Sequence, residues 1–185
     1  MGHSGVILTI FQKDTAKNTA YLSLGSNMNN PCAQLKEAIE RLKKLGIVVQ
    51  VSSFYKTEPL ELKEQSWFIN CSLRFNTNLD PKSLMYACLR IEQEMRRRRT
   101  ERKGPRAIDI DLLLFNNEVM DEPDLQLPHP AMQHRRFALA PLAEIAPDAW
   151  HPGLHKTALE LLQALGEGGG IVQKLDFCFE NTGEP

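Results

Sequence analysis

Two helix starts of the same kind, at Asn30-Pro31 and at Asp80-Pro81, constrain the fold of this chain more than any other feature. In each, a side chain that can cap free backbone N–H groups precedes a proline, which is favoured in the first turn of a helix. Apolar residues then recur at helical spacing, so each start opens an amphipathic helix. Four segments around these helices have strand character: 20–24, 47–55, 68–75 and 107–115.

The resulting order is strand, helix, strand, strand, helix, strand. It predicts an α+β fold with a ferredoxin-like βαββαβ core, in which helices pack on a mostly antiparallel sheet. In the third strand, strict alternation directs one set of residues to the core: Ile69, Cys71, Leu73 and Phe75. The helices are expected to bury two stripes: Leu35, Ile39, Leu42 and Leu45, and Leu84, Cys88, Ile91 and Met95.

The chain after residue 115 carries weaker signals. Asn116-Asn117 favours a hairpin that returns through 119–120. Residues 137–146 have helical character and are expected to be interrupted near Pro141, because proline removes a helical hydrogen bond.

A capping box, Thr157 with Glu160, starts a last helix that is expected to bury Leu159 and Leu162. The Gly-rich run after this helix indicates flexibility. The length suits a single domain. The predicted division is an N-terminal tail, 1–18, one domain, 19–165, and a C-terminal tail, 166–185.

One stretch sets positive charge directly before two carboxylates. Segment 96–106 has six arginines and one lysine against one glutamate, a net charge of +6 in a chain of net charge −1. Asp109 and Asp111 follow in a predicted strand, where residues i and i+2 share a face about 6.6 Å apart. The aliphatic residues that alternate with them are expected to face the core: Ile108, Ile110, Leu112 and Leu114. One concentrated cationic segment suits a small polyanion such as a nucleotide better than a long nucleic acid.

Each half of this stretch alone has an ordinary structural explanation. The aspartates could solvate the open face of an edge strand, and the arginines could stabilise a helix C-terminus. Together they suit an ATP–magnesium complex, because carboxylates and phosphates ligate Mg²⁺ whereas arginines bind phosphate oxygens. The sequence has no GxxxxGK[ST] P-loop and no protein-kinase signature, so side chains and metal are expected to hold the phosphates.

The four cysteines form no CxxC or metal-ligand pattern, and we expect reduced thiols. No segment approaches the roughly 18 apolar residues that span a bilayer. The apolar run 5–11 lacks the features of a signal peptide. These observations favour the cytoplasm.

The stretch GPRAIDIDLLLF, 104–115, preceded by RRRT at 97–100, resembles the signature of the 6-hydroxymethyl-7,8-dihydropterin pyrophosphokinase family. Further segments fall in the family's order and spacing: LGSN at 24–27, SSFYKT at 52–57, FIN at 68–70, and LPHP at 127–130 through RRF at 135–137. The resemblance covers about residues 19–165, and its main motif is far more specific than two spaced aspartates.

This resemblance implies transfer of pyrophosphate from ATP to the hydroxymethyl group of the pterin, with release of AMP, in folate biosynthesis. It implies two Mg²⁺ ions on Asp109 and Asp111, and a catalytic role for Arg97 and Arg106 at the phosphates. The positions that match the family's ATP site are Glu92, Arg97, Arg99, Arg102, Arg106, His129 and Arg135. Those that match its pterin site are Thr57, Leu60, Phe68, Asn70 and Phe137, with the phenylalanines stacking on the ring and Asn70 reading its edge.

The chain departs from the family at three positions. Arg96 stands where Gly is common, Lys103 where some members carry Trp, and Glu58 where Pro or an apolar residue is common. None of them removes an expected metal ligand, so activity is expected. No residue is assigned as the general base for the hydroxymethyl proton.

The alternative from another class is a ferredoxin-like RNA- or nucleotide-binding module without catalysis. Such a module would carry aromatic residues on its sheet, where this chain has Asp109 and Asp111, which repel phosphates in the absence of metal. A degenerate family member kept for structure is a third reading, which the intact motif argues against. The expected partners are therefore ATP and the pterin, with no nucleic acid and no membrane, and association with other folate-pathway enzymes is left open.

Overall fold

The computed structural model of the protein describes residues 16–28, 30–59, 65–95, 107–166 and 168–175. Four α-helices lie in these ranges, α1 (Pro31–Leu42), α2 (Pro81–Glu94), α3 (Arg136–Ile145) and α4 (Ala158–Leu165), with a 3₁₀ turn, η1, at Met132–His134. The strands there are β1 (Asn18–Ser26), β2 (Ile47–Val51), β3 (Phe54–Thr57), β4 (Phe68–Thr77), β5 (Asp109–Phe115), β6 (Met120–Asp121), β7 (Gln126–Leu127), β8 (Trp150–His151), β9 (Lys156–Thr157) and β10 (Val172–Leu175).

The main sheet has the strand order β10-β3-β4-β1-β5, and β2 also pairs with β4. All of these pairings are antiparallel. The predicted mixed α/β fold with a mostly antiparallel sheet is therefore confirmed. The single strand expected over 47–55 is instead two strands, β2 and β3. Ser52 between them still contacts β4, because its N donates to Ser72 O and its Oγ accepts from Ser72 N, both at 2.9 Å.

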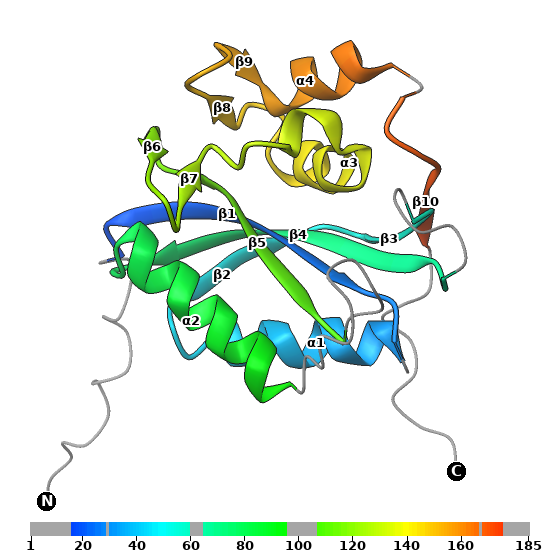
Figure 1. The fold of residues 1–185 in the computed structure, drawn as a ribbon, viewed down its shortest axis with the longest axis horizontal. Coiled ribbons are helices and arrows are strands. Elements are labelled where there is room, and N and C mark those ends of the chain that lie inside the picture. Colours follow the sequence, from blue (N-terminus) through cyan, green and yellow to red (C-terminus); the bar gives the residue numbers. More distant parts are fainter. Residues whose placement is uncertain (1–15, 29, 60–64, 96–106, 167, 176–185) are drawn as a thin grey trace, which may run out of the picture.

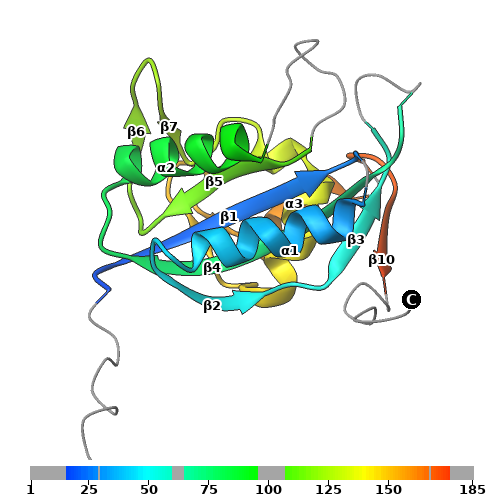
Figure 2. The ribbon, with the colours of Figure 1, turned by 90° about the horizontal axis from the view of Figure 1, so that it is seen from below.

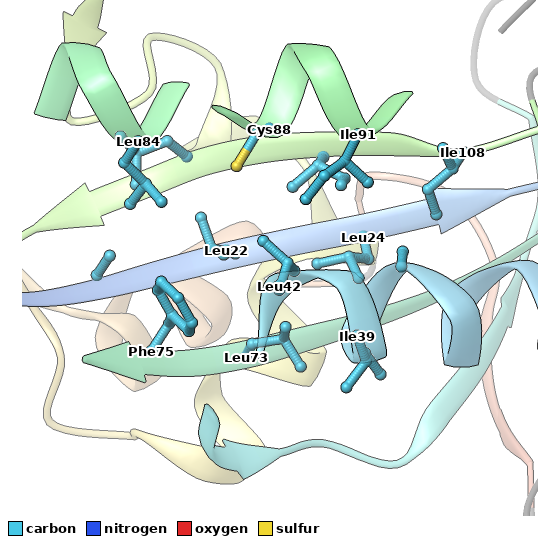
Figure 3. Packing of buried hydrophobic residues seen from close by; sticks show 14 of the residues in the cluster. Leu22, Leu24, Ile39, Leu42, Leu73, Phe75, Leu84, Cys88, Ile91 and Ile108 are labelled. Carbon is cyan, nitrogen blue, oxygen red and sulfur yellow. The ribbon is translucent and has the colours of Figure 1, made fainter. Parts of the chain in front are cut away.

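Helices cover the sheet on both faces (Figure 1). α1 and α2 lie side by side on one face, as Figure 2 shows, and α3 with α4 lies on the other. On the first face, residues such as Leu42, Ile91 and Phe75 form one core (Figure 3). A second core lies under α3 and α4 and includes Leu139 and Leu161. Because the middle of the sheet is covered on both faces, ligand sites are expected at the strand ends and along the edge at β5.

The predicted helix starts are confirmed. The side chains of Asn30 and Asp80 each accept a hydrogen bond from the backbone N–H three residues on, at 3.2 and 3.0 Å. Thr157 and Glu160 form the capping box. The stripes expected on α1 and α2 are buried, apart from Leu45, which lies after α1 and is only partly buried. Local cap chemistry therefore determines where these helices begin.

A β-bulge in β5 changes which residues face each core. The register with β1 shifts by one residue after Leu112. Leu113 and Leu114 therefore both pack in the core under α3, whereas Phe115 returns to the core beside α1 and α2. The expectation that Leu114 shares a face with Leu112 is wrong, because simple alternation does not hold across a bulge.

Two further local predictions are wrong. Asn116, with φ of 46°, follows the last residue of β5. The chain does not return as a hairpin along β5, because β6 pairs with β7. α3 continues through Pro141 rather than breaking there.

Of the two residues that α4 was expected to bury, Leu162 is partly buried against the core under α3, but Leu159 is not. Ala158 and Leu161 are buried, whereas Leu159 is 41% exposed. The helix starts at the predicted cap, so the difference comes from packing against α3 and not from the helix start. The prediction that Leu159 is buried is wrong.

Part of the segment expected to be flexible belongs to the main sheet. β10 pairs antiparallel with β3 over four residue pairs, from Val172–Thr57 to Leu175–Phe54. The glycines that precede β10 predict flexibility, which does not extend to 172–175. The predicted domain limits themselves stay a prediction.

The expectation that all cysteines are reduced thiols is wrong for Cys32, which is disulfide-bonded. The absence of a CxxC pattern does not exclude pairing between cysteines that are distant in sequence. Cys71 and Cys88 are free and buried, as expected for core positions. Among the described residues, no helix combines the length and apolar character that crossing a bilayer requires.

Candidate active site

Asp109 and Asp111, the expected metal ligands, lie on the outer strand β5. Ile110 between them packs in the core beside α1 and α2, so both carboxylates lie on the opposite face of the sheet. Asp111 Oδ2 is 3.5 Å from Arg135 Nη1, and about a third of each side chain is exposed. Two carboxylates on one face suit Mg²⁺, which typically takes one or two carboxylates and completes its shell with water and phosphate oxygens.

Glu92, expected near ATP, holds the backbone between these aspartates. It projects from α2 and is only 2% exposed. Its Oε1 accepts a hydrogen bond from Ile110 N at 2.7 Å. An edge strand has backbone groups without a neighbouring strand, and this carboxylate satisfies one of them. Glu92 therefore fixes the section of β5 that carries both aspartates.

Asn70 and Thr57, both expected at the pterin, contact each other at the other side of β1. Asn70 lies on β4 and is 4% exposed, and Thr57 lies on β3 and is 2% exposed. Asn70 Nδ2 donates to Thr57 Oγ1 at 2.7 Å. Phe68 is directly opposite Thr57 in the β3–β4 ladder and is partly exposed. The structure thus brings three of the expected pterin residues to one end of the sheet.

Gly25 on β1 separates the two groups of residues. It is opposite Asn70 on one side and opposite Asp109 on the other. Residues in one such row point to the same face, so Asn70 and Asp109 flank a position without a side chain. A Cβ at Gly25 would lie 2.5 Å from Asn70 Oδ1, which is too close. The glycine therefore lets the Asn70 amide lie over β1.

Arg135, at the start of α3, contacts both an expected metal ligand and an expected aromatic residue of the pterin site. Arg135, which precedes α3, contacts Asp111 and also has its Cζ 5.7 Å from the ring centre of Phe137. The Phe137 ring is partly exposed. Among the described interactions there is no ring contact between Phe137 and Phe68. The expected aromatic pair is therefore placed on two separate elements.

An open cleft of about 790 Å³ lies at the edge of the sheet beside β5. α2 forms one wall and the β6–β7 hairpin another, and Figure 2 shows that hairpin beside α2. Four of the expected site residues line the cleft: Glu92, Asp109, Asp111 and His129.

Polar contacts hold the outer wall of the cleft against α2. Tyr86 Oη donates to Asp124 Oδ2 at 2.7 Å, and Lys82 forms ion pairs with Glu122 and Asp124. Asp121 also lines this wall, so carboxylates face the cleft from both sides. A polyphosphate in the cleft therefore needs cations beside it.

Residues 21–147, more than half of the chain, match the family model of 7,8-dihydro-6-hydroxymethylpterin-pyrophosphokinase (HPPK). The chain belongs to the HPPK family. The resemblance inferred from the sequence motifs is thereby confirmed.

Two HPPK relatives match along most of their own length, and each is named 2-amino-4-hydroxy-6-hydroxymethyldihydropteridine pyrophosphokinase. The Methylorubrum extorquens protein is 42% identical over 152 residues, 81% of this chain and 95% of the relative. The Haemophilus influenzae protein is 41% identical over 132 residues, 70% of this chain and 82% of the relative.

Other HPPK relatives are much longer. A folic acid synthesis protein of Dictyostelium discoideum is 37% identical over 158 residues, 85% of this chain but only 24% of the relative. The chain therefore spans about a quarter of that curated protein. A solved structure of a Plasmodium falciparum HPPK-DHPS variant matches 83% of this chain and 46% of that chain, with a TM-score of 0.66 and 20% identity. At this identity the likeness concerns the fold.

Not all residues expected from the HPPK motifs can be placed. Nine lie in the described part of the chain. The other five lie outside the described residues and stay predictions: Leu60, Arg97, Arg99, Arg102 and Arg106.

His129 is held as a neutral imidazole. Burial and the nearby Arg135 guanidinium lower its pKa to about 4, although Asp109 acts in the opposite direction. Its Nδ1 accepts a hydrogen bond from Ala131 N at 3.2 Å, so the proton of the neutral ring lies on Nε2. His129 can therefore donate to a phosphate oxygen without carrying charge itself.

This pKa predicts a loss of stability in acid. Between about pH 6.5 and pH 4 the unfolded chain binds a proton at His129 that the folded protein does not bind, so the free energy of unfolding falls as pH is lowered. The expected loss is about 3 kcal/mol, complete near pH 4. Urea unfolding of the metal-free protein across this range measures it.

The matched variants are His129→Gln and His134→Gln, the second at an exposed position just before α3. The first is expected to flatten the pH dependence and the second to leave it unchanged. Equal pH dependence in the wild type and in His129→Gln would contradict the prediction.

Gly25 is the site residue that sequence reasoning missed. The sequence predicts a strand over 20–24, whereas β1 continues through Gly25 to Ser26. The available signal was a glycine inside a strand pattern, which often marks a close approach of another group. Here that group is the Asn70 side chain.

Proposed function

We propose that the protein is an ATP-dependent pyrophosphokinase of folate biosynthesis. It transfers pyrophosphate from ATP to the hydroxymethyl group of 6-hydroxymethyl-7,8-dihydropterin and gives AMP and the pterin diphosphate. Family membership and the names of relatives matched along most of their length support this activity. The observation that carries it in the structure is the row Asn70–Gly25–Asp109, with an amide and a carboxylate on either side of a bare strand position.

Asn70 is suited to read the edge of a pterin ring. Its Nδ2 donates a hydrogen bond to Thr57 Oγ1, and its Oδ1 lies over Gly25. That oxygen can accept an N–H from a heteroaromatic ring, while Phe68 and Phe137 offer apolar faces for stacking. This arrangement orients the hydroxymethyl group of the ring toward β5.

Asp109 and Asp111 would hold Mg²⁺ at the phosphates, and we propose two ions that bind with ATP. When bound, the metal neutralises the phosphate oxygens during the displacement. Arg135 and neutral His129 add donors beside them. Because carboxylates line the cleft on both sides, cations are required there, and Arg97 and Arg106 are the residues proposed to support the transfer.

A ferredoxin-like core is supported by the order β3-β4-β1-β5 with α1 and α2 on one face. A cytoplasmic location is proposed as well. Association with other folate-pathway enzymes is supported by relatives in which a matching segment is part of a longer chain. A binding module without catalysis is not favoured by the family match.

The purified protein is expected to form AMP from ATP only when Mg²⁺ and 6-hydroxymethyl-7,8-dihydropterin are both present. Pyrophosphate leaves ATP as one unit, so the nucleotide product is AMP rather than ADP. Chromatography of the nucleotides measures this directly. Omission of the pterin and chelation of the metal are the controls. ADP as the product, or no AMP with all components present, would contradict the proposal.

A further inference from the structure

The segment 168–175, here named the C-terminal strap, joins parts of the candidate site that are distant in sequence. Its strand β10 pairs with β3, and Val172 lies opposite Thr57. Next to this pair, Glu58 N donates to Ile171 O at 3.1 Å. The strap therefore extends the sheet beside Thr57, on the side away from β4.

The other end of the strap contacts the first residue of α3. Arg136 Nη1 donates to Gly166 O, just before the strap. Gly169, with φ of 85°, comes so close that a Cβ there would lie 2.9 Å from Arg136 Cβ and 3.0 Å from Arg136 N. Arg136 stands between Arg135 and Phe137, so this contact acts on the turn that carries both.

A third contact ties the strap to the end of α3. Lys174 Nζ donates to Glu144 Oε1 at 2.9 Å. Glu144 also accepts from Tyr55 Oη at 2.8 Å and from Ser53 Oγ at 2.7 Å, at β3 and just before it. The strap, β3 and α3 are therefore linked near both ends of the helix, and Figure 1 shows the chain descending from α4 to β10 beside α3.

We propose that the C-terminal strap positions the pterin side of the site, and that Gly169 is a positioning residue for the pterin. Phe137 comes from α3, whereas Thr57 and Phe68 come from β3 and β4, so their spacing depends on how α3 is docked. The strap contacts both α3 and β3. The expected metal ligands lie on β5, at the opposite edge of the sheet from β10. This inference rests on the proposed function.

The test compares Gly169→Ala with Gly153→Ala. Alanine at Gly169 places a Cβ against Arg136 at a positive φ and is expected to displace the first turn of α3. The KM for the pterin is expected to rise about tenfold, because small displacements of positioning groups have large kinetic effects. The KM for ATP is expected to change less than about threefold, since Arg135 is one of several ATP-side residues.

Gly153 in the turn between β8 and β9 is the matched control. A Cβ there would make an ordinary contact, 3.6 Å from His151 Cε1. Both KM values are expected to stay within about twofold of the wild type. Gly169→Asn is the second variant, because asparagine tolerates a positive φ better and still places a Cβ against Arg136. Thermal midpoints are measured first, and kinetics are recorded well below the lowest of them.

A selective rise in the pterin KM in both Gly169 variants supports the proposal. Unchanged KM values in both variants would overturn it, and so would an equal rise for ATP and pterin, which indicates general loosening. A wild type that forms no AMP would overturn the proposed function and the pterin assignment with it. An active wild type with unaffected Gly169 variants would overturn the role of the strap alone.

Discussion

The Asp111→Asn variant is expected to lose about three orders of magnitude in the rate of AMP formation while it keeps its fold. A bound metal stabilises developing charge in phosphoryl transfer by several kcal/mol, and about 4 kcal/mol corresponds to about a thousandfold in rate. Asparagine keeps the shape of the side chain but removes the charge. Because 31% of the Asp111 side chain is exposed and its contact with Arg135 is long, the loss of folding stability is expected to be below about 1 kcal/mol. Rates at several Mg²⁺ concentrations, with circular dichroism, measure both effects.

Asp148→Asn is the matched control, because this aspartate is exposed and lies in the loop after α3, away from the cleft. It is expected to retain the wild-type rate and the wild-type Mg²⁺ dependence. A near-normal rate for Asp111→Asn at saturating Mg²⁺ would show that Asp111 does not hold the catalytic metal.

The Asn70→Ala variant is expected to lower kcat/KM for the pterin by about a thousandfold and to leave the affinity for ATP within about twofold. A site built to hydrogen-bond its substrate discriminates strongly once that partner is lost. The change also leaves Thr57 Oγ1, in a residue only 2% exposed, without the amide that donates to it, at a cost of about 1–3 kcal/mol in stability. Titration of the pterin in the presence of a non-hydrolysable ATP analogue separates binding from chemistry.

Asn76→Ala provides the comparison on the same strand. Asn76 lies six residues further along β4, on the same face, and its Oδ1 accepts from Thr19 Oγ1 at 3.1 Å. This variant loses a side-chain amide of the same kind but is distant from Gly25 and Thr57. If it weakened pterin binding as much as Asn70→Ala does, the loss would reflect damage to β4 rather than recognition by Asn70.

Features that depend on a few neighbouring residues could be predicted from the sequence. The caps at Asn30, Asp80 and Thr157 are local hydrogen bonds, and each helix starts where they indicate. The placement of Asp109 and Asp111 on one face follows from the two-residue period of a strand. This period holds in β5 up to the bulge after Leu112.

Features that depend on tertiary contacts could not be predicted. β10 follows a glycine-rich run, and its strand character arises from the open edge of β3 with which it pairs. The position of Leu114 depends on a register shift against β1, and burial of Glu92 depends on the backbone of an edge strand. The sequence indicated that Asn70 belongs to the site, but its contact with Thr57 requires the β3–β4 register. None of these features can be recognised from the residue pattern of a single segment.

Because Gly25 has no side chain, a ligand can lie across β1 between Asn70 and Asp109, and the strand spacing then sets the distance between the two ligand groups that contact them. A molecule that touches both Asn70 and Asp109 crosses two inter-strand spacings, about 9.5 Å, over the backbone of β1. That distance is set by hydrogen-bonded strand pairing and not by the reach of flexible side chains. Substitutions around the site can therefore alter affinity as sequences diverge, while the required length of the ligand stays constant for as long as these three strands remain in register.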